Sequence, residues 1–262
     1  MRLKPIIAAV FVVVLFVFAG CKKKDEPVKN FGLTSITDTT GVALSNFSYG
    51  ADGKLVKLFT TANSTDLYYS GDKLIRRTYT DGATLKEIDS VYYDAQGRIF
   101  KVVNWDAVAN TKSKTTVFVF NVDNTINSTT VNYESALKED ELYEFTYSGG
   151  KLTERIKSVF TGGSYKLSQK FEFQGYDDKA SPFSKIYRPY LTDILNAFVF
   201  FVAYPNNITL GKYTTYDTGT GLVTGVTPVT ATYTYNTDNL PTRMDITEGG
   251  AIGSYLITYQ EL

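Results

Sequence analysis

The chain has 262 residues with 27 basic and 27 acidic side chains, so it has no basic excess to neutralise the phosphates of a nucleic acid. It contains no histidine and one cysteine, which excludes a histidine-based triad, an internal disulfide and a zinc site of histidine and cysteine ligands. Twenty tyrosines and seventeen phenylalanines favour a strand-rich fold. We therefore expect no nucleic acid partner, no metal and no cofactor.

The first twenty residues have the pattern of an export signal. Arg2 and Lys4 supply positive charge, and residues 6–19 form an unbroken apolar run. This run is shorter than the ~20 residues that a membrane-spanning helix needs, and it is typical of a signal peptide. Gly20 then precedes Cys21, which resembles the lipobox of bacterial lipoproteins. The resemblance implies cleavage between these two residues and acylation of Cys21.

Residues 21–30 are charged, contain a proline and predict a solvated tether. Residues 22–26 also resemble the charged export signals of surface lipoproteins in the Bacteroidetes, so a plain tether and a sorting signal are both open. The sequence predicts an outer membrane lipoprotein, facing the periplasm or the cell surface. Its contact with the membrane is expected to be the N-terminal lipid only.

A local pattern recurs along the rest of the chain. It consists of alternating aromatic residues, a turn rich in aspartate, asparagine and glycine, and a basic or polar residue followed by leucine or isoleucine. Six clear instances begin at Phe47, Tyr68, Tyr92, Phe118, Tyr147 and Tyr233. From Leu55 to Leu152 the aligned aliphatic residues lie 19–27 residues apart, which suffices for two short strands and two turns. Each unit therefore predicts a β-hairpin.

The strands of these units show period-two alternation. Between Thr230 and Tyr235, for example, three threonines alternate with one alanine and two tyrosines. Such a pattern indicates an antiparallel sheet with one buried face. Repeated hairpins without helical crossovers predict an all-β meander of roughly a dozen strands. We expect it to curl into an open or partial barrel that forms a single domain over residues 31–262.

The segment from Tyr93 to Ile99, with Asp94, Gly97 and Arg98, is similar to the core of a YD (RHS-type) repeat. Residues 31–262 as a whole resemble uncharacterised Bacteroidetes lipoprotein families with such repeats, including the group labelled DUF4595. The resemblance implies a porin-like, open-barrel fold and assigns no activity.

A barrel that spans the membrane is the main alternative to a water-soluble sheet. Most alternating runs last five to seven residues before a turn, whereas a spanning strand needs ~9–11 residues. The strand from Lys151 to Lys157 also has charges on both faces, which a lipid-facing wall disfavours. We therefore predict that the domain does not span the membrane.

The repeat lapses between residues 180 and 212. An apolar insertion near 186–204 has helical spacing and would also suit a buried strand. It is interpreted either as a plug or lid for the mouth of the sheet, or as a ligand-gripping segment with Tyr187, Arg188 and Tyr190 at its rim. Trp105, the single tryptophan, would stack on a sugar ring or belong to the core.

No pattern of residues predicts catalysis. The aspartates cluster at turns and match no calcium-binding loop. Glu144, Glu154 and Glu172 lie on regular strands, where pairing with lysine or arginine on a neighbouring strand is expected. We therefore expect a non-enzymatic binding or interaction module for a glycan or an envelope protein. The alternatives are a carboxylate-dependent hydrolase acting on glycans and a purely structural envelope component.

Overall fold

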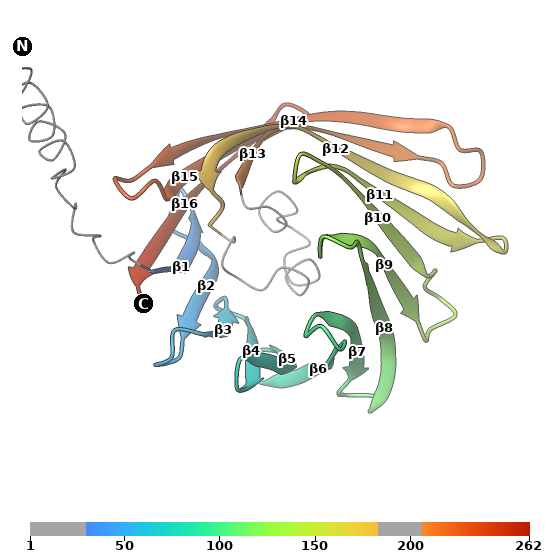
Figure 1. The fold of residues 1–262 in the computed structure, drawn as a ribbon, viewed down its shortest axis with the longest axis horizontal. Coiled ribbons are helices and arrows are strands. Elements are labelled where there is room, and N and C mark those ends of the chain that lie inside the picture. The colour runs from blue at the N-terminus through green and yellow to red at the C-terminus, as the bar shows by residue number, and fades with distance from the viewer. Residues whose placement is uncertain (1–29, 183–205) are drawn as a thin grey trace, which may run out of the picture. The chain divides into compact units, whose positions relative to one another are not determined.

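The computed structural model describes residues 30–182 and 206–262, which form sixteen β-strands and no helix (Figure 1). Each strand pairs antiparallel with the next, and β16 lies beside β1, so that the sheet closes into a barrel. No helix in the described part of the chain is long and apolar enough to cross a bilayer. The strands in chain order are β1 Phe31–Asp38, β2 Ala43–Tyr49, β3 Leu55–Phe59, β4 Asn63–Ser70, β5 Lys73–Asp81, β6 Thr84–Tyr93, β7 Ile99–Asp106, β8 Thr111–Phe120, β9 Ile126–Tyr133, β10 Glu141–Ser148, β11 Lys151–Thr161, β12 Ser164–Ala180, β13 Asn206–Tyr216, β14 Val223–Tyr235, β15 Pro241–Glu248 and β16 Ala251–Glu261.

The antiparallel meander is confirmed, whereas the expectation of roughly a dozen strands in an open or partial barrel is wrong. The six repeat units account for the strand pairs from β2 to β11 and for β14 with β15. The other four strands, β1, β12, β13 and β16, do not have the repeat. Closure joins β16 to β1, where the Thr258 hydroxyl lies 2.7 Å from the hydroxyls of Thr34 and Ser35. A closed barrel leaves no sheet edge with unpaired backbone groups.

The strands are also longer than the five to seven residues expected. Their lengths range from 5 residues in β3 to 17 in β12, because alternation continues through polar residues that look like turn residues in the sequence. Strand length therefore gives no argument against a spanning barrel, and only the charges on the outer wall bear on that question.

Several sequence predictions fall outside the described residues. These are the signal peptide, Cys21, most of the tether, and the insertion near 186–204 with Tyr187, Arg188 and Tyr190.

The barrel has two different rims, which follow from the up-and-down order of its strands. We call the rim where β1 begins and β16 ends the terminal rim; it has the turns that lead from each even-numbered strand to the next. The opposite end, the distal rim, has the turns that lead from each odd-numbered strand to the next. Buried apolar side chains form one cluster on β1–β9, β15 and β16 and a second on β11–β14.

A row of six tyrosines near the terminal rim ties six even-numbered strands to the odd-numbered strands that precede them. Each tyrosine lies near the end of an even-numbered strand, and its hydroxyl donates to the carbonyl of a buried residue at the start of the preceding odd-numbered strand. The pairs are Tyr49 to Leu33 at 3.0 Å, Tyr69 to Leu55 at 2.8 Å, Tyr93 to Leu74 at 3.0 Å, Tyr176 to Leu152 at 2.5 Å, Tyr233 to Ile208 at 2.8 Å and Tyr259 to Pro241 at 2.9 Å. In the pairs Tyr69–Leu55 and Tyr93–Leu74, the aromatic and aliphatic positions of the repeat are thus the two ends of one hydrogen bond.

The basic position of the repeat also has a structural role. The cation that follows a turn lies over the aromatic ring of the next unit, at distances from the ring centre within the range of a cation–π contact. These contacts are Lys54 on Tyr69 at 5.9 Å, Lys73 on Tyr93 at 5.1 Å, Arg98 on Phe120 at 4.6 Å and Lys151 on Tyr176 at 5.5 Å.

Turn chemistry explains the aspartates and asparagines between the two halves of a unit. Asp94 accepts hydrogen bonds from the backbone N–H groups of Gln96 and Arg98 at 3.0 and 2.9 Å. Gly97 follows at a φ of 78°, and Asn124 occupies the equivalent place in a later unit at a φ of 65°. Glycine and asparagine are the residues that adopt this left-handed conformation at the lowest cost.

Loss of one hydroxyl from the tyrosine row should measurably destabilise the barrel. We expect Tyr69→Phe to lower the free energy of unfolding by about 1 kcal/mol, because it removes a part-buried hydrogen bond but keeps the ring. The matched control is Tyr68→Phe on the other face of the same strand, where the residue is 40 % exposed; it should cost less than about 0.5 kcal/mol. Urea unfolding measures both changes, and equal losses would contradict the role of the row.

The same tyrosines predict sensitivity to alkaline pH. Burial raises the pKa of Tyr49 to about 12 and also raises the pKa of Tyr69, Tyr176, Tyr233 and Tyr259. In the unfolded chain these groups titrate near ~10, so the folded state binds more protons above that pH. The stabilisation is complete below about pH 10 and is lost as the pH rises toward about 12. Urea midpoints should fall over this interval; a constant midpoint would refute the expectation.

Candidate functional site

A pocket of about 860 Å³ opens at the distal rim, where β6, β7, β8 and β9 meet their turns. Its volume lies within the range of about 300–1,000 Å³ that is usual for small-molecule sites. The lining is mostly polar: four lysines, three carboxylates, one asparagine, two serines, one threonine and one tyrosine, with Val108 as its aliphatic residue.

Strand register brings the residues at the base of this pocket into one row. Arg77 on β5 lies opposite Asp89 on β6, which lies opposite Asn104 on β7. Asn104 in turn lies opposite Lys114 on β8, and Lys114 opposite Tyr133 on β9. Directly opposed residues share a face of the sheet, so these five side chains follow the inner wall across five strands.

The first three members of the row form a buried polar network. Arg77, Asp89 and Asn104 are 5 %, 3 % and 3 % exposed. Asn104 Nδ2 donates to Asp89 Oδ1 at 2.6 Å and to Glu87 Oε2 at 3.0 Å. The Ser113 hydroxyl donates to Asn104 Oδ1, so that the amide is held on both sides.

Arg77 supplies the positive charge of this network. Its Nε lies 2.7 Å from Asp89 Oδ2, and its Nη2 lies 3.4 Å from Glu87 Oε2. The contact at Nε is ionic, because the Nε–H bond is not directed at an acceptor well enough for a hydrogen bond. A buried carboxylate needs such compensation, and the resulting network fixes the floor of the pocket.

The carboxylates that line the pocket are all engaged by other groups of the protein. Glu87 contacts Arg77 and Asn104, as described above. Asp106 accepts from the backbone N–H groups of Val108 and Ala109 at 2.9 and 2.8 Å. Glu134 forms an ion pair with Lys112 at 2.6 Å.

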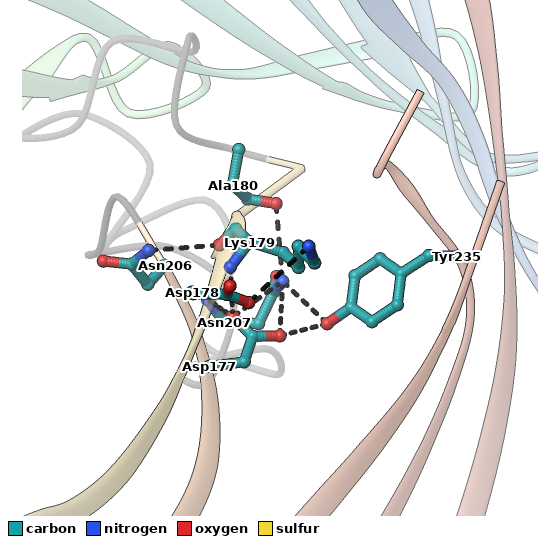
Figure 2. Close-up of polar contacts among 7 residues, drawn as sticks. All are labelled: Asp177, Asp178, Lys179, Ala180, Asn206, Asn207 and Tyr235. Carbon is teal, nitrogen blue, oxygen red and sulfur yellow. Dashed lines mark hydrogen bonds and ion pairs between the residues drawn. The ribbon is translucent and has the colours of Figure 1, made fainter. Parts of the chain in front are cut away.

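A second polar cluster lies at the terminal rim, where β12 ends and β13 begins (Figure 2). Asn207, which is 3 % exposed, donates from Nδ2 to Asp177 at 3.1 Å and to the Tyr235 hydroxyl at 3.2 Å. The Tyr235 hydroxyl donates to Asp177; burial and this carboxylate raise the pKa of Tyr235. These polar groups hydrogen-bond to one another and join β12, β13 and β14. We therefore interpret the cluster as a structural contact between these three strands.

The residues proposed from the sequence do not converge on the distal pocket. Trp105 lies on β7 between the lining residues Asn104 and Asp106 but does not itself line the pocket. It is 41 % exposed and is therefore not a core residue. Tyr187, Arg188 and Tyr190 lie outside the described residues.

The strand carboxylates behave as expected for paired surface groups. Glu154 lies 2.5 Å from Lys170, and Glu172 lies 2.6 Å from Lys212. Among residues 30–182 and 206–262, no group of three or more potential histidine, cysteine, aspartate or glutamate ligands is placed to hold a metal ion.

Sequence reasoning missed the pocket, although a signal for it was present. On β6, Glu87 and Asp89 alternate in phase with Val91 and Tyr93, which belong to or pack against the apolar core. Charged residues on the apolar face of an amphipathic strand indicate either a buried ion pair or a site.

Comparison with solved structures identifies proteins of similar fold. A porin-like protein from Bacteroides vulgatus matches with a TM-score of 0.53 and 15 % identity, over 88 % of this chain and 100 % of that one. A porin-like protein from Bacteroides uniformis matches with a TM-score of 0.49 and 13 % identity, over 88 % and 96 % of the respective chains. No family model and no curated protein matches the sequence. The first likeness shows a porin-like fold, and the resemblance to YD repeats and DUF4595 stays a prediction.

The buried network predicts a large cost for loss of its cation. Arg77→Met should lower the free energy of unfolding by about 3–5 kcal/mol, because it leaves the buried Asp89 carboxylate without its cation. Adding Asp89→Asn should restore part of this loss.

The matched control for Arg77→Met is Arg243→Met. Arg243 pairs with Asp245 at 2.8 Å, and its side chain is 45 % exposed, so this change should cost about 0–1 kcal/mol. Urea unfolding measures the free energy of unfolding of both variants. Similar losses at the two arginines would contradict the role of Arg77 in the buried network.

Proposed function

We propose that this chain is an outer membrane lipoprotein whose barrel binds a glycan in the distal-rim pocket. The observation that carries the proposal is the polar pocket itself, built on a rigid buried network at the rim opposite to the start of β1. A role as an enzyme is not part of the proposal, because each lining carboxylate is already engaged by other protein groups.

The order of the elements would leave the pocket accessible to a ligand if the protein is anchored through Cys21. Cys21 precedes β1 by ten residues, which span at most about 35 Å when fully extended. A lipid on Cys21 would therefore retain the terminal rim near the membrane. The pocket lies at the other end of the strands and would open toward the surrounding medium.

The outer wall of the barrel supports attachment by the lipid only. Lys170 and Glu172 alternate along β12 with Phe171 and Phe173, which are buried in the apolar core. The side chains of Lys170 and Glu172 are both 28 % exposed. Charges on a lipid-facing wall cost about 2–4 kcal/mol per basic residue at the bilayer midplane, so the wall is suited to water.

The lining of the pocket favours a glycan over an apolar ligand. Thr111 and Ser135 supply hydroxyl groups to the lining, and its lysines supply ammonium groups, which suit the many hydroxyls of a sugar. Sites for apolar ligands are instead lined mainly by hydrophobic side chains.

An envelope protein is the second candidate partner. The distal-rim turns expose several large apolar residues, namely Val42, Val108, Leu137 and Leu222, at 58 %, 66 %, 96 % and 68 %. These residues lie in the turns after β1, β7, β9 and β13, where a partner that covers the rim would bury them. In this alternative the rim, rather than the pocket, would be the binding surface.

Flotation of vesicles with the full-length lipoprotein tests the anchor and the pocket together. We expect the wild-type protein to float with the vesicles and to carry fluorescent oligosaccharide from a mixed panel. Cys21→Ser should stay in the aqueous fraction and still bind sugar. Thr111→Trp, which fills the pocket, should float but carry about tenfold less sugar.

The control for the filled pocket is Thr232→Trp, at an exposed position of β14. It should float and bind sugar like the wild type. Flotation of Cys21→Ser would overturn the lipid anchor, and a wild-type protein that binds no sugar of the panel would overturn the pocket.

A further inference from the structure

We infer that the distal-rim pocket selects an acidic glycan, in which carboxylate groups contact the lysines of the lining. This inference rests on the proposed function and specifies the chemistry of its ligand. Its support is a difference between the two kinds of charge in the pocket. The carboxylates are all compensated by other groups of the protein, whereas two of the lysines have no carboxylate partner among the described residues.

The negative charges of the lining are already compensated within the protein. Glu87 contacts the Arg77 guanidinium, Asp106 accepts two backbone hydrogen bonds at the β7–β8 turn, and Glu134 pairs with Lys112. None of the three is left to attract a cationic ligand or to repel an anionic one at full strength.

The positive charges are not used in the same way. The lining contains four lysines, of which Lys112 pairs with Glu134. Lys86 pairs with no carboxylate of the described residues. Lys138 lies 5.3 Å from the ring centre of Tyr133 and likewise has no carboxylate partner in the described part of the chain. Two ammonium groups are therefore available for a ligand.

The positions of these two lysines suit an extended ligand. Lys86 lies on β6 and Lys138 in the β9–β10 turn, with β7 and β8 between them in the sheet. A ligand that met both would cross the pocket over Ser113 and Lys114. Tyr133, beneath Lys138, offers an aromatic ring at that end.

This local excess is not a consequence of overall composition. The chain has equal numbers of basic and acidic residues, and the surface pairs on the outer wall are balanced. The lining has four lysines and three carboxylates, so the pocket has a small local excess of positive charge that the chain as a whole does not have. Because their charges are near water, binding should weaken as the salt concentration rises.

The test compares trigalacturonate with the same trisaccharide after methyl esterification, using the full-length protein and titration calorimetry. We expect the acid to bind about tenfold more tightly than the ester, with a preference that disappears at high salt. Lys86→Gln combined with Lys138→Gln should remove most of that preference, because it weakens binding of the acid far more than binding of the ester.

Lys166→Gln is the matched control, because Lys166 lies near the distal rim on β12 and does not line the pocket. It should preserve the preference for the acid. Equal affinity for acid and ester would overturn the acidic selectivity and leave the glycan-binding proposal standing. A preference that survives the double lysine change would overturn the assignment to these lysines. Failure of both sugars to bind would count against the proposed function as well as the inference.

Discussion

The hydrogen bond from a tyrosine hydroxyl to a backbone carbonyl of the preceding strand is the contact on which the barrel depends. It recurs on six of the eight even-numbered strands, and several of its carbonyl partners belong to the most deeply buried residues. Each bond adds a link from side chain to backbone between two strands that are already paired in the ladder. The cation over the next ring adds a second link at the same level. The terminal rim is therefore tied together unit by unit around most of the barrel.

Because the tyrosine hydrogen bonds lie at the terminal rim, they place no constraint on the residues of the distal-rim turns. Turns at the terminal rim combine a residue with positive φ with an aspartate or asparagine in most units, as at Gly97 and Asp94. Four of these turns are followed by a basic residue that lies over an aromatic ring farther along the sheet. Turns at the distal rim are joined to neighbouring hairpins by backbone hydrogen bonds, as from Gly82 to Ala62. Near this rim the inner wall of β5–β9 has polar residues such as Asn104. Binding sites are commonly placed on such variable loops over a rigid scaffold. The Arg77 network provides the rigid part of this site.

The same inner face thus serves two purposes along its length. Near the terminal rim it buries residues such as Leu74 and Ile99, and near the distal rim it buries Asp89 and Asn104. The second set is retained at an energetic cost unless every charge and amide is paired. The network meets that condition, so its polarity is compatible with a stable wall and gives the pocket an ordered floor. The outer wall has cross-strand ion pairs such as Lys170 with Glu154 and Lys212 with Glu172.

The sequence by itself determined the local parts of this protein: the hairpin unit, the antiparallel alternation and the turn residues such as Asp94 and Gly97. These depend on interactions within about ten residues, and their patterns are visible in any unit. The sixteen strands, closure at Thr258 with Thr34, and the Arg77–Asp89–Asn104 row were decided by the tertiary structure. Strand register and closure depend on pairing between segments that are separated in sequence, and the four strands without the repeat give no local sign of their partners. For that reason the meander was predictable, whereas the closed barrel and its pocket were not.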